Sequence, residues 1–160
     1  MRVWPLLPMA LLAMAEEKPR PVNLEEQKKE LLELHRKDRR AHFENNAELA
    51  LSDKLDQGFI SVRNGAVTRR DKSDFQKTLE GYFKNAKYYE WDDLEPPIVR
   101  ISNDGSMAWM IVRVRVRRIQ QNPSGAAVEE KFIYAGISTY EKRGGKWIQV
   151  ANVSTFEQMS

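Results

Sequence analysis

The chain has 160 residues, of which 41% are hydrophobic and 31% charged, and its net charge at pH 7 is +3. This length fits one domain with a single core, and the small positive excess is far below that of a typical nucleic-acid-binding domain. The sequence contains no cysteine, which excludes disulfides, thiolate catalysis and zinc sites built on cysteine.

The N-terminal segment has the order of a secretory signal. Arg2 precedes an apolar run, and that run ends in Ala13-Met14-Ala15 before the charged "EEKPR". The run is too short to span a bilayer, so we expect no membrane anchor. We expect residues 1–15 to be removed on export to the periplasm or the exterior, and residues 16–23, with two prolines, to be a disordered linker.

Three helices are predicted in the first half of the chain. The first begins at Asn23, an N-cap with Glu26 three residues later, and ends near Glu44. The second is expected over about 46–56, after two asparagines that break the first. The third is expected over 71–83, where apolar and aromatic side chains recur at helical spacing.

Strands are predicted over most of the remaining sequence. Asn64-Gly65 indicates a hairpin between the second and third helices, and Asp104-Gly105 and Gly144-Gly145 indicate two more. Residues 120–127 are expected to form a flexible loop. Helices followed by a long antiparallel meander predict one α+β domain, over 24–160, with the helices packed on one side of a sheet.

The strand "AWMIVRVRVRR" alternates strictly, so its two faces can be predicted. One face should be concave and helix-facing, and the other should be solvated or dimer-facing. Three glutamates on the adjoining strand offer partners to the arginines, which favours a solvated face over nucleic-acid contact. The concave set is Ala108, Met110, Val112, Val114 and Val116, and the outer set is Trp109, Ile111, Arg113, Arg115 and Arg117, with Glu129, Glu130 and Glu141 as partners.

The later turns of the first helix place polar side chains where its earlier turns place leucines. His35, Asp38 and His42 share one face at a spacing of three and four residues. The two histidines are two turns apart, about 10 Å along the axis. They could not both bind one ion, so we expect no metal. Either the three side chains line a ligand pocket, or they are polar groups satisfied by the protein or the solvent.

This layout resembles the nuclear transport factor 2-like superfamily, and more narrowly its SnoaL-like branch. The resemblance covers about 24–157 and depends on the hairpin after "DQGFISVRNG", on the strand "DGSMAWMIVRVRV", and on "GGKWIQVANVST" at the end. It implies a curved antiparallel sheet wrapped around three N-terminal helices, which is a cone-shaped, cystatin-like roll with a pocket at its open end. It also implies that the first helix lines that pocket and that members form homodimers through the outer sheet face.

Several other residues are candidates for the wall of this pocket. Trp91 and Asp93 belong to an aromatic-rich stretch and are expected at its mouth, while Tyr134 and Asn152 are polar residues in apolar strand patterns. With His35 and His42 they form the expected ligand-binding set. His42 and Asp38 are the expected catalytic pair if the protein is an enzyme.

The resemblance does not extend to the residues of steroid-isomerase chemistry. The isomerase-like members place a base carboxylate on the strand after the second helix, and the matching stretch here is Val62-Arg63-Asn64. Their tyrosine on the first helix has no counterpart either, because no tyrosine precedes Tyr82. Steroid isomerisation is therefore not expected.

Two hypotheses of different classes follow. The first is an exported domain that binds a small, partly apolar molecule of unknown identity, without a cofactor and without nucleic acid. The second is a small cofactor-independent enzyme, of dehydratase, cyclase or isomerase type, in which His42 transfers protons. A role in assembly through the outer sheet face is the third possibility.

Overall fold

The computed structural model describes residues 23–159, and the expected signal and most of the linker lie outside this range. Three helices and seven strands make up this part of the chain. The helices are α1 (Leu24–Phe43), α2 (Ala47–Leu51) and α3 (Lys72–Phe83), and the strands are β1 (Phe59–Arg63), β2 (Ala66–Arg70), β3 (Ala86–Asp93), β4 (Ile98–Ile101), β5 (Met107–Gln121), β6 (Ala127–Arg143) and β7 (Lys146–Gln158).

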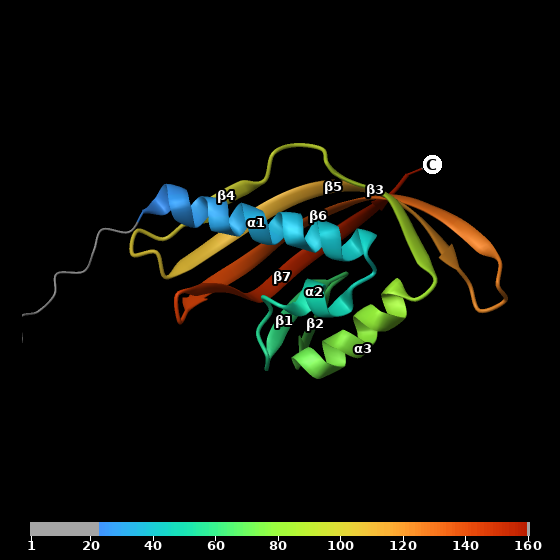
Figure 1. Ribbon diagram of the computed structural model, residues 1–160, viewed down its shortest axis with the longest axis horizontal. Helices are drawn as coiled ribbons and strands as arrows, with labels where there is room; N and C mark the ends of the chain where they lie inside the picture. Colours follow the sequence, from blue (N-terminus) through green and yellow to red (C-terminus); the bar gives the residue numbers. More distant parts are fainter. Residues whose placement is uncertain (1–22, 160) are drawn as a thin grey trace, which may run out of the picture.

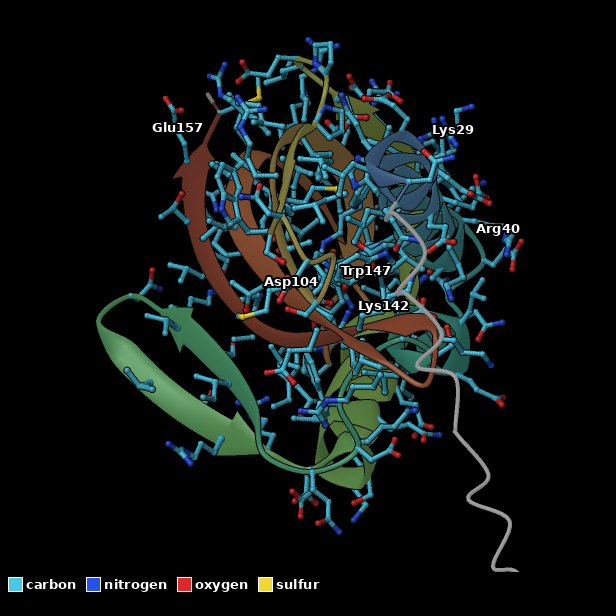
Figure 2. The ribbon with its side chains drawn as sticks, turned by 90° about the vertical axis from the view of Figure 1, so that its left-hand side faces the viewer. Lys29, Arg40, Asp104, Lys142, Trp147 and Glu157 are labelled. Carbon is cyan, nitrogen blue, oxygen red and sulfur yellow. The ribbon has the colours of Figure 1, made fainter. Side chains whose placement is uncertain are left out.

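The strands form one open sheet in the order β2-β1-β7-β6-β5-β3, and β4 also pairs with β5. The helices lie on one side of it, with α1 running across β4, β5 and β6 (Figure 1). The last strands bend strongly around α1, while the β1–β2 hairpin projects from the rest of the molecule (Figure 2). This confirms the predicted α+β architecture, with helices inside a curved sheet.

One pairing differs from the predicted all-antiparallel sheet. β1 pairs with β7 in parallel, with Ile60 beside Ala151 and Arg63 beside Ser154. The pairing joins strands that lie about ninety residues apart, so no local turn signal announces it. The sheet is therefore mixed, and this pairing attaches the β1–β2 hairpin to the main sheet.

The second helix is much shorter than predicted. It covers only Ala47–Leu51, not 46–56, although Asn46 caps it as expected by accepting a hydrogen bond from the Leu49 amide at 2.9 Å. The chain leaves the helix because residues 53–55 pair with β7 instead: Gln149 N donates to Asp53 O at 2.7 Å, and Leu55 N donates to Gln149 O at 2.9 Å. A tertiary pairing thus overrides the helical pattern.

The two faces of β5 are as predicted. Every residue of the concave set is buried, and Trp109 and Ile111 on the outer face are 36% and 37% exposed. Buried aromatic side chains of α3, β3 and β7 extend this core, among them Phe83, Trp91 and Trp147. The core lies between α1 and the concave face, where apolar burial stabilises the domain.

The first half of α1 is fixed tightly to this core. Leu31 is completely buried, and Lys142 on β6 pairs with Glu30 at 2.6 Å. The same ammonium lies 4.8 Å from the centre of the Trp147 ring, and the two side chains lie side by side in Figure 2. Toward the C-terminal end of α1, polar groups replace the leucines.

Candidate functional site

His35 and Asp93 join α1 to β3. His35 is buried, and its Nε2 lies 2.7 Å from Asp93 Oδ1, while its ring packs 5.2 Å from that of Trp91. Arg39 adds a second link, because its Nε donates to the Trp91 carbonyl at 2.8 Å. The structure thus brings three predicted ligand-binding residues together, but their polar groups are directed at one another.

His42 lies in an aromatic cage two turns further along α1 than His35. Its ring centre is 5.3 Å from each of the rings of Phe83, Tyr88 and Trp91. Nδ1 is 2.8 Å from the carbonyl oxygen of Asp38, and because a carbonyl only accepts, Nδ1 carries the proton. When the ring carries this one proton, Nε2 is an acceptor, and within residues 23–159 no hydrogen bond to it is formed.

Asp38, between these histidines, acts by its charge on a second group of polar side chains. We call this group the concave cluster, and it combines α1, the segment after α2, and the inner faces of β6 and β7. Lys54 Nζ donates to Gln149 Oε1 at 2.8 Å, and Gln149 Nε2 donates to Ser138 Oγ at 2.7 Å. The members of the concave cluster are Asp38, Lys54, Tyr134, Ser138, Tyr140, Gln149 and Asn152.

The backbone explains why Lys54 points inward. The short parallel bridge between Lys54 and Gln149 makes this segment extended, so successive side chains alternate in direction. Asp53 forms an ion pair with Lys37 on α1. Lys54 takes the opposite direction and bonds to Gln149, which is itself buried.

Burial controls the ionisation of the concave cluster. It raises the pKa of Tyr134 to about 12, with the Asp38 charge acting in the same direction, and it raises the pKa of Tyr140 further. Both phenols therefore stay neutral at physiological pH. Burial lowers the pKa of Lys54, and the Asp38 and Asp53 carboxylates oppose this shift.

Tyr134 has its position because Gly136 has no side chain. A Cβ at Gly136 would stand 2.5 Å from the Tyr134 hydroxyl oxygen and 2.8 Å from the Val153 carbonyl oxygen. The Asn152 side chain bonds to that hydroxyl, whereas its Oδ1 is buried without a partner among the described residues. A buried amide oxygen without a donor is costly, so this end of the cluster has unused hydrogen-bonding capacity.

Asp38 remains accessible although it faces the sheet. It lies on the same helical face as Leu31, which is 0% exposed, yet 38% of the Asp38 side chain is exposed. The helix therefore leaves the concave face open to solvent at Asp38, although Ala41, one turn later, is completely buried. Water or a solute reaches this carboxylate.

The predicted site residues thus separate into two groups. His35, Trp91 and Asp93 lie toward β3, whereas Asp38, Tyr134 and Asn152 belong to the concave cluster. His42 stands between them, with Nδ1 3.9 Å from Asp38 Oδ2. Lys54 and Gln149 are not among the predicted site residues. Lys54 was expected in a helix, whereas the alternation with Trp147 does place Gln149 on the inner face.

Two surface depressions are lined by members of neither group. One, of about 530 Å³, is lined by Asn45 and α3 residues, and the other, of about 270 Å³, lies between α1 and the β6–β7 turn beside Trp147. Within residues 23–159 no three acidic, histidine or cysteine side chains are grouped to hold a metal ion. No helix of the described part has the length and apolar character needed to cross a membrane.

Comparisons with known proteins identify the fold. No family model and no curated protein matches the sequence. Solved structures do match, among them an uncharacterised protein with a cystatin-like fold from Caulobacter vibrioides, at a TM-score of 0.63 and 15% identity over 83% of this chain and 91% of that one. An NTF2-like protein with a cystatin-like fold from Novosphingobium aromaticivorans matches at 0.61 and 16%, over 86% of both chains.

A ketosteroid isomerase-like protein from Erwinia carotovora also matches, at a TM-score of 0.61 and 8% identity, over 84% of this chain and 98% of that one. The chain therefore has the nuclear transport factor 2-like, cystatin-like fold. Sequence identity this low defines the architecture and leaves the activity to the residues of the site.

Proposed function

We propose that this protein is an exported domain that binds a small, partly apolar molecule in a recess between α1 and the concave sheet face. The observation that carries the proposal is the accessible carboxylate of Asp38, on the buried face of α1 and beside the concave cluster. A charged group in such a position needs a polar partner, which water or a ligand supplies.

The chemistry of the walls supports a ligand of mixed character. Tyr134 and Lys54 supply hydrogen-bond donors, and Asp38 accepts. Val114 and Phe132 supply buried apolar surface on the neighbouring positions of β5 and β6. Small-molecule sites combine apolar walls with a few placed polar groups in this way.

The test is ligand-observed NMR with a fragment set, performed on the wild type and on matched variants. We expect fragments that bind the wild type to lose binding in Asp38→Asn and in Tyr134→Phe. Glu33→Gln changes a carboxylate on the exposed face of the same helix and should leave binding unchanged. Fragments that bind all four proteins equally would place the site elsewhere.

A proton-transfer enzyme in the same recess is the second candidate. It is favoured by the 3.9 Å approach of His42 Nδ1 to the Asp38 carboxylate and by the free acceptor Nε2. For a substrate found among bound fragments, His42→Gln should lower kcat by about a hundredfold or more. Unchanged turnover in that variant would leave binding as the function.

Two further proposals concern location and assembly. Residues 1–15 act as a cleaved signal, which N-terminal sequencing of the secreted or periplasmic protein would test; a mature chain that begins at Met1 would reject cleavage. The partner is a second copy of the chain, which meets the outer sheet face.

A further inference from the structure

Lys54 supplies the amine among the described members of the concave cluster, and its side chain points toward the concave face. Its Nζ bonds to the neutral Gln149 amide, whereas the ammonium groups of Lys37, Lys72 and Lys142 pair directly with carboxylates. Deepening the proposed function, and dependent on it, we propose that Lys54 forms a reversible imine with an aldehyde or ketone bound in the recess.

The geometry supplies what imine formation requires. The hydrogen bond from Nζ to Gln149 Oε1 fixes the direction of the amine, and Gln149 is fixed in turn by its bond to Ser138. Asp38 is close enough for its charge to act on Lys54, Tyr134 and Tyr140 together. A nucleophile, a proton carrier and two neutral hydroxyl groups therefore belong to one cluster, in which the carboxylate of Asp38 is the group open to solvent.

The reaction is balanced without an oxidant or a cofactor. The nitrogen lone pair of neutral Lys54 attacks the carbonyl carbon, a C–N bond forms, and the π electrons move to oxygen. Asp38 takes a proton from nitrogen and passes it to the oxygen, which gives a carbinolamine. Asp38 then carries the second nitrogen proton to the hydroxyl group, which leaves as water while the electron pair on nitrogen forms the C=N bond.

The ionisation of Lys54 favours this role. Burial lowers its pKa, so a larger fraction is neutral at a given pH than for an exposed lysine. The opposing charges of Asp38 and Asp53 keep this effect moderate. Lys28 and Lys29 on α1 are fully outside the recess and provide an internal reference for ordinary amines.

The experiment uses benzaldehyde with sodium cyanoborohydride, which reduces an imine to a stable benzylamine. Intact protein is treated at pH 7, digested and mapped by mass spectrometry. We expect Lys54 to be labelled faster than Lys28 or Lys29, because a lowered pKa leaves more free amine at the same pH. Its labelling rate should also reach half-maximum at a lower pH than theirs. Equal rates would overturn the inference.

Two variants separate chemistry from packing. Lys54→Arg keeps the charge and cannot form an imine, so it should lose this label while Lys28 and Lys29 react as before. Asp38→Asn removes a charge that favours protonated Lys54, and this effect by itself would raise the labelling rate of Lys54. A fall in that rate would show that Asp38 carries the proton of the amine. A rise would overturn that part of the inference.

Failure of the imine and failure of the binding function are distinguishable. Fragments that bind both the wild type and Lys54→Arg, together with unselective labelling, would overturn the imine and keep the proposed function. If labelling is unselective and no fragment loses binding in Asp38→Asn or Tyr134→Phe, both the imine and the proposed binding function are overturned.

Discussion

Gly136 is the residue whose replacement is most informative. In Gly136→Ala the new methyl would meet the Tyr134 hydroxyl and the Val153 carbonyl, and the latter is backbone that cannot rotate away. We expect a loss of about 1–3 kcal/mol in the free energy of unfolding, as for overpacking in a core. Urea unfolding of the variant and the wild type measures this, and an unchanged midpoint would contradict the close packing of Tyr134.

Gly81 provides the opposite case within the same protein. It lies inside α3, where an added Cβ meets nothing within 4 Å. Gly81→Ala should stabilise the protein by about 0.5–1 kcal/mol, because alanine loses less backbone entropy in a helix. The same urea measurement serves as the check, and destabilisation here would show that α3 packs more closely than described.

Asp104 should give the β4–β5 turn a dependence on acid pH. Its Oδ1 accepts from Ser102 Oγ at 2.6 Å, from Ser106 Oγ at 2.8 Å and from Ser106 N at 3.0 Å, and these bonds lower its pKa from 3.8 to about 2. A depressed pKa stabilises the folded state above pH 3.8, and this contribution is lost as the pH falls toward 2.

The matched variant is Asp104→Asn, which keeps an acceptor and loses the charge. The difference in melting temperature between wild type and variant should be largest above pH 4 and should shrink steadily between pH 4 and 2. A constant difference over that range would contradict the assignment. NMR titration of the Asp104 carboxyl carbon locates the pKa directly.

At this scale the sequence predicted which residue types face inward, but not their partners. His35, Asp38 and His42 do share a face of α1, as their spacing requires. His35 pairs with Asp93 on β3, and the Asp38 charge acts on Lys54 and on two tyrosines of β6; periodicity carries no information about such pairs. Whether these side chains bind a ligand stays a prediction.

Helix ends were predictable where side-chain chemistry decides them. Asn23 caps α1 by accepting from Glu26 N at 3.2 Å, as the sequence indicates, and Asn45 ends that helix with a positive φ of 51°. The length of α2 was not predictable, because the pairing of residues 53–55 with β7 ends it. That same pairing places Lys54 in the concave cluster.

The cap of α2 should therefore matter more than its five residues suggest. Asn46→Ala removes the acceptor for the Leu49 amide and should cost about 1 kcal/mol of stability. Asn46→Asp retains an acceptor and should cost little. If both variants unfold at the same denaturant concentration as the wild type, the cap contributes nothing measurable.

At the scale of the whole molecule, strand alternation predicted both faces of the sheet and the helices on one of them. The parallel β1–β7 pairing was missed, and it has a consequence for the outer face. It continues a row of aliphatic residues across six strands, each beside the next in register: Ile98, Ile111, Ile137, Val153, Val62 and Val67. We call it the outer aliphatic row.

The outer aliphatic row is the surface on which we expect a second copy to dock. Four of its residues are between 37% and 67% exposed, namely Ile98, Ile111, Val153 and Val67. Trp109 lies on the same face of β5, two residues before Ile111. Contiguous exposed apolar surface of this kind marks an interaction site. A two-fold dimer would place like rows against each other, with the arginines of β5 at the rim.

Ile111→Lys, in the middle of the row, should weaken this dimer by about 2 kcal/mol or more, a thirtyfold rise in Kd, because it buries a charge at the centre of the interface. Val128→Lys is the control, since Val128 is similarly exposed but belongs to the inner-face register of β6. Sedimentation velocity over a concentration series measures association, and circular dichroism confirms that each variant folds.

A wild type that sediments as a monomer throughout, or an Ile111→Lys variant that associates as strongly as the wild type, would exclude the outer aliphatic row as the interface. Because α1 and the concave cluster lie on the opposite side of the sheet, ligand binding should persist in Ile111→Lys, which separates assembly from recognition.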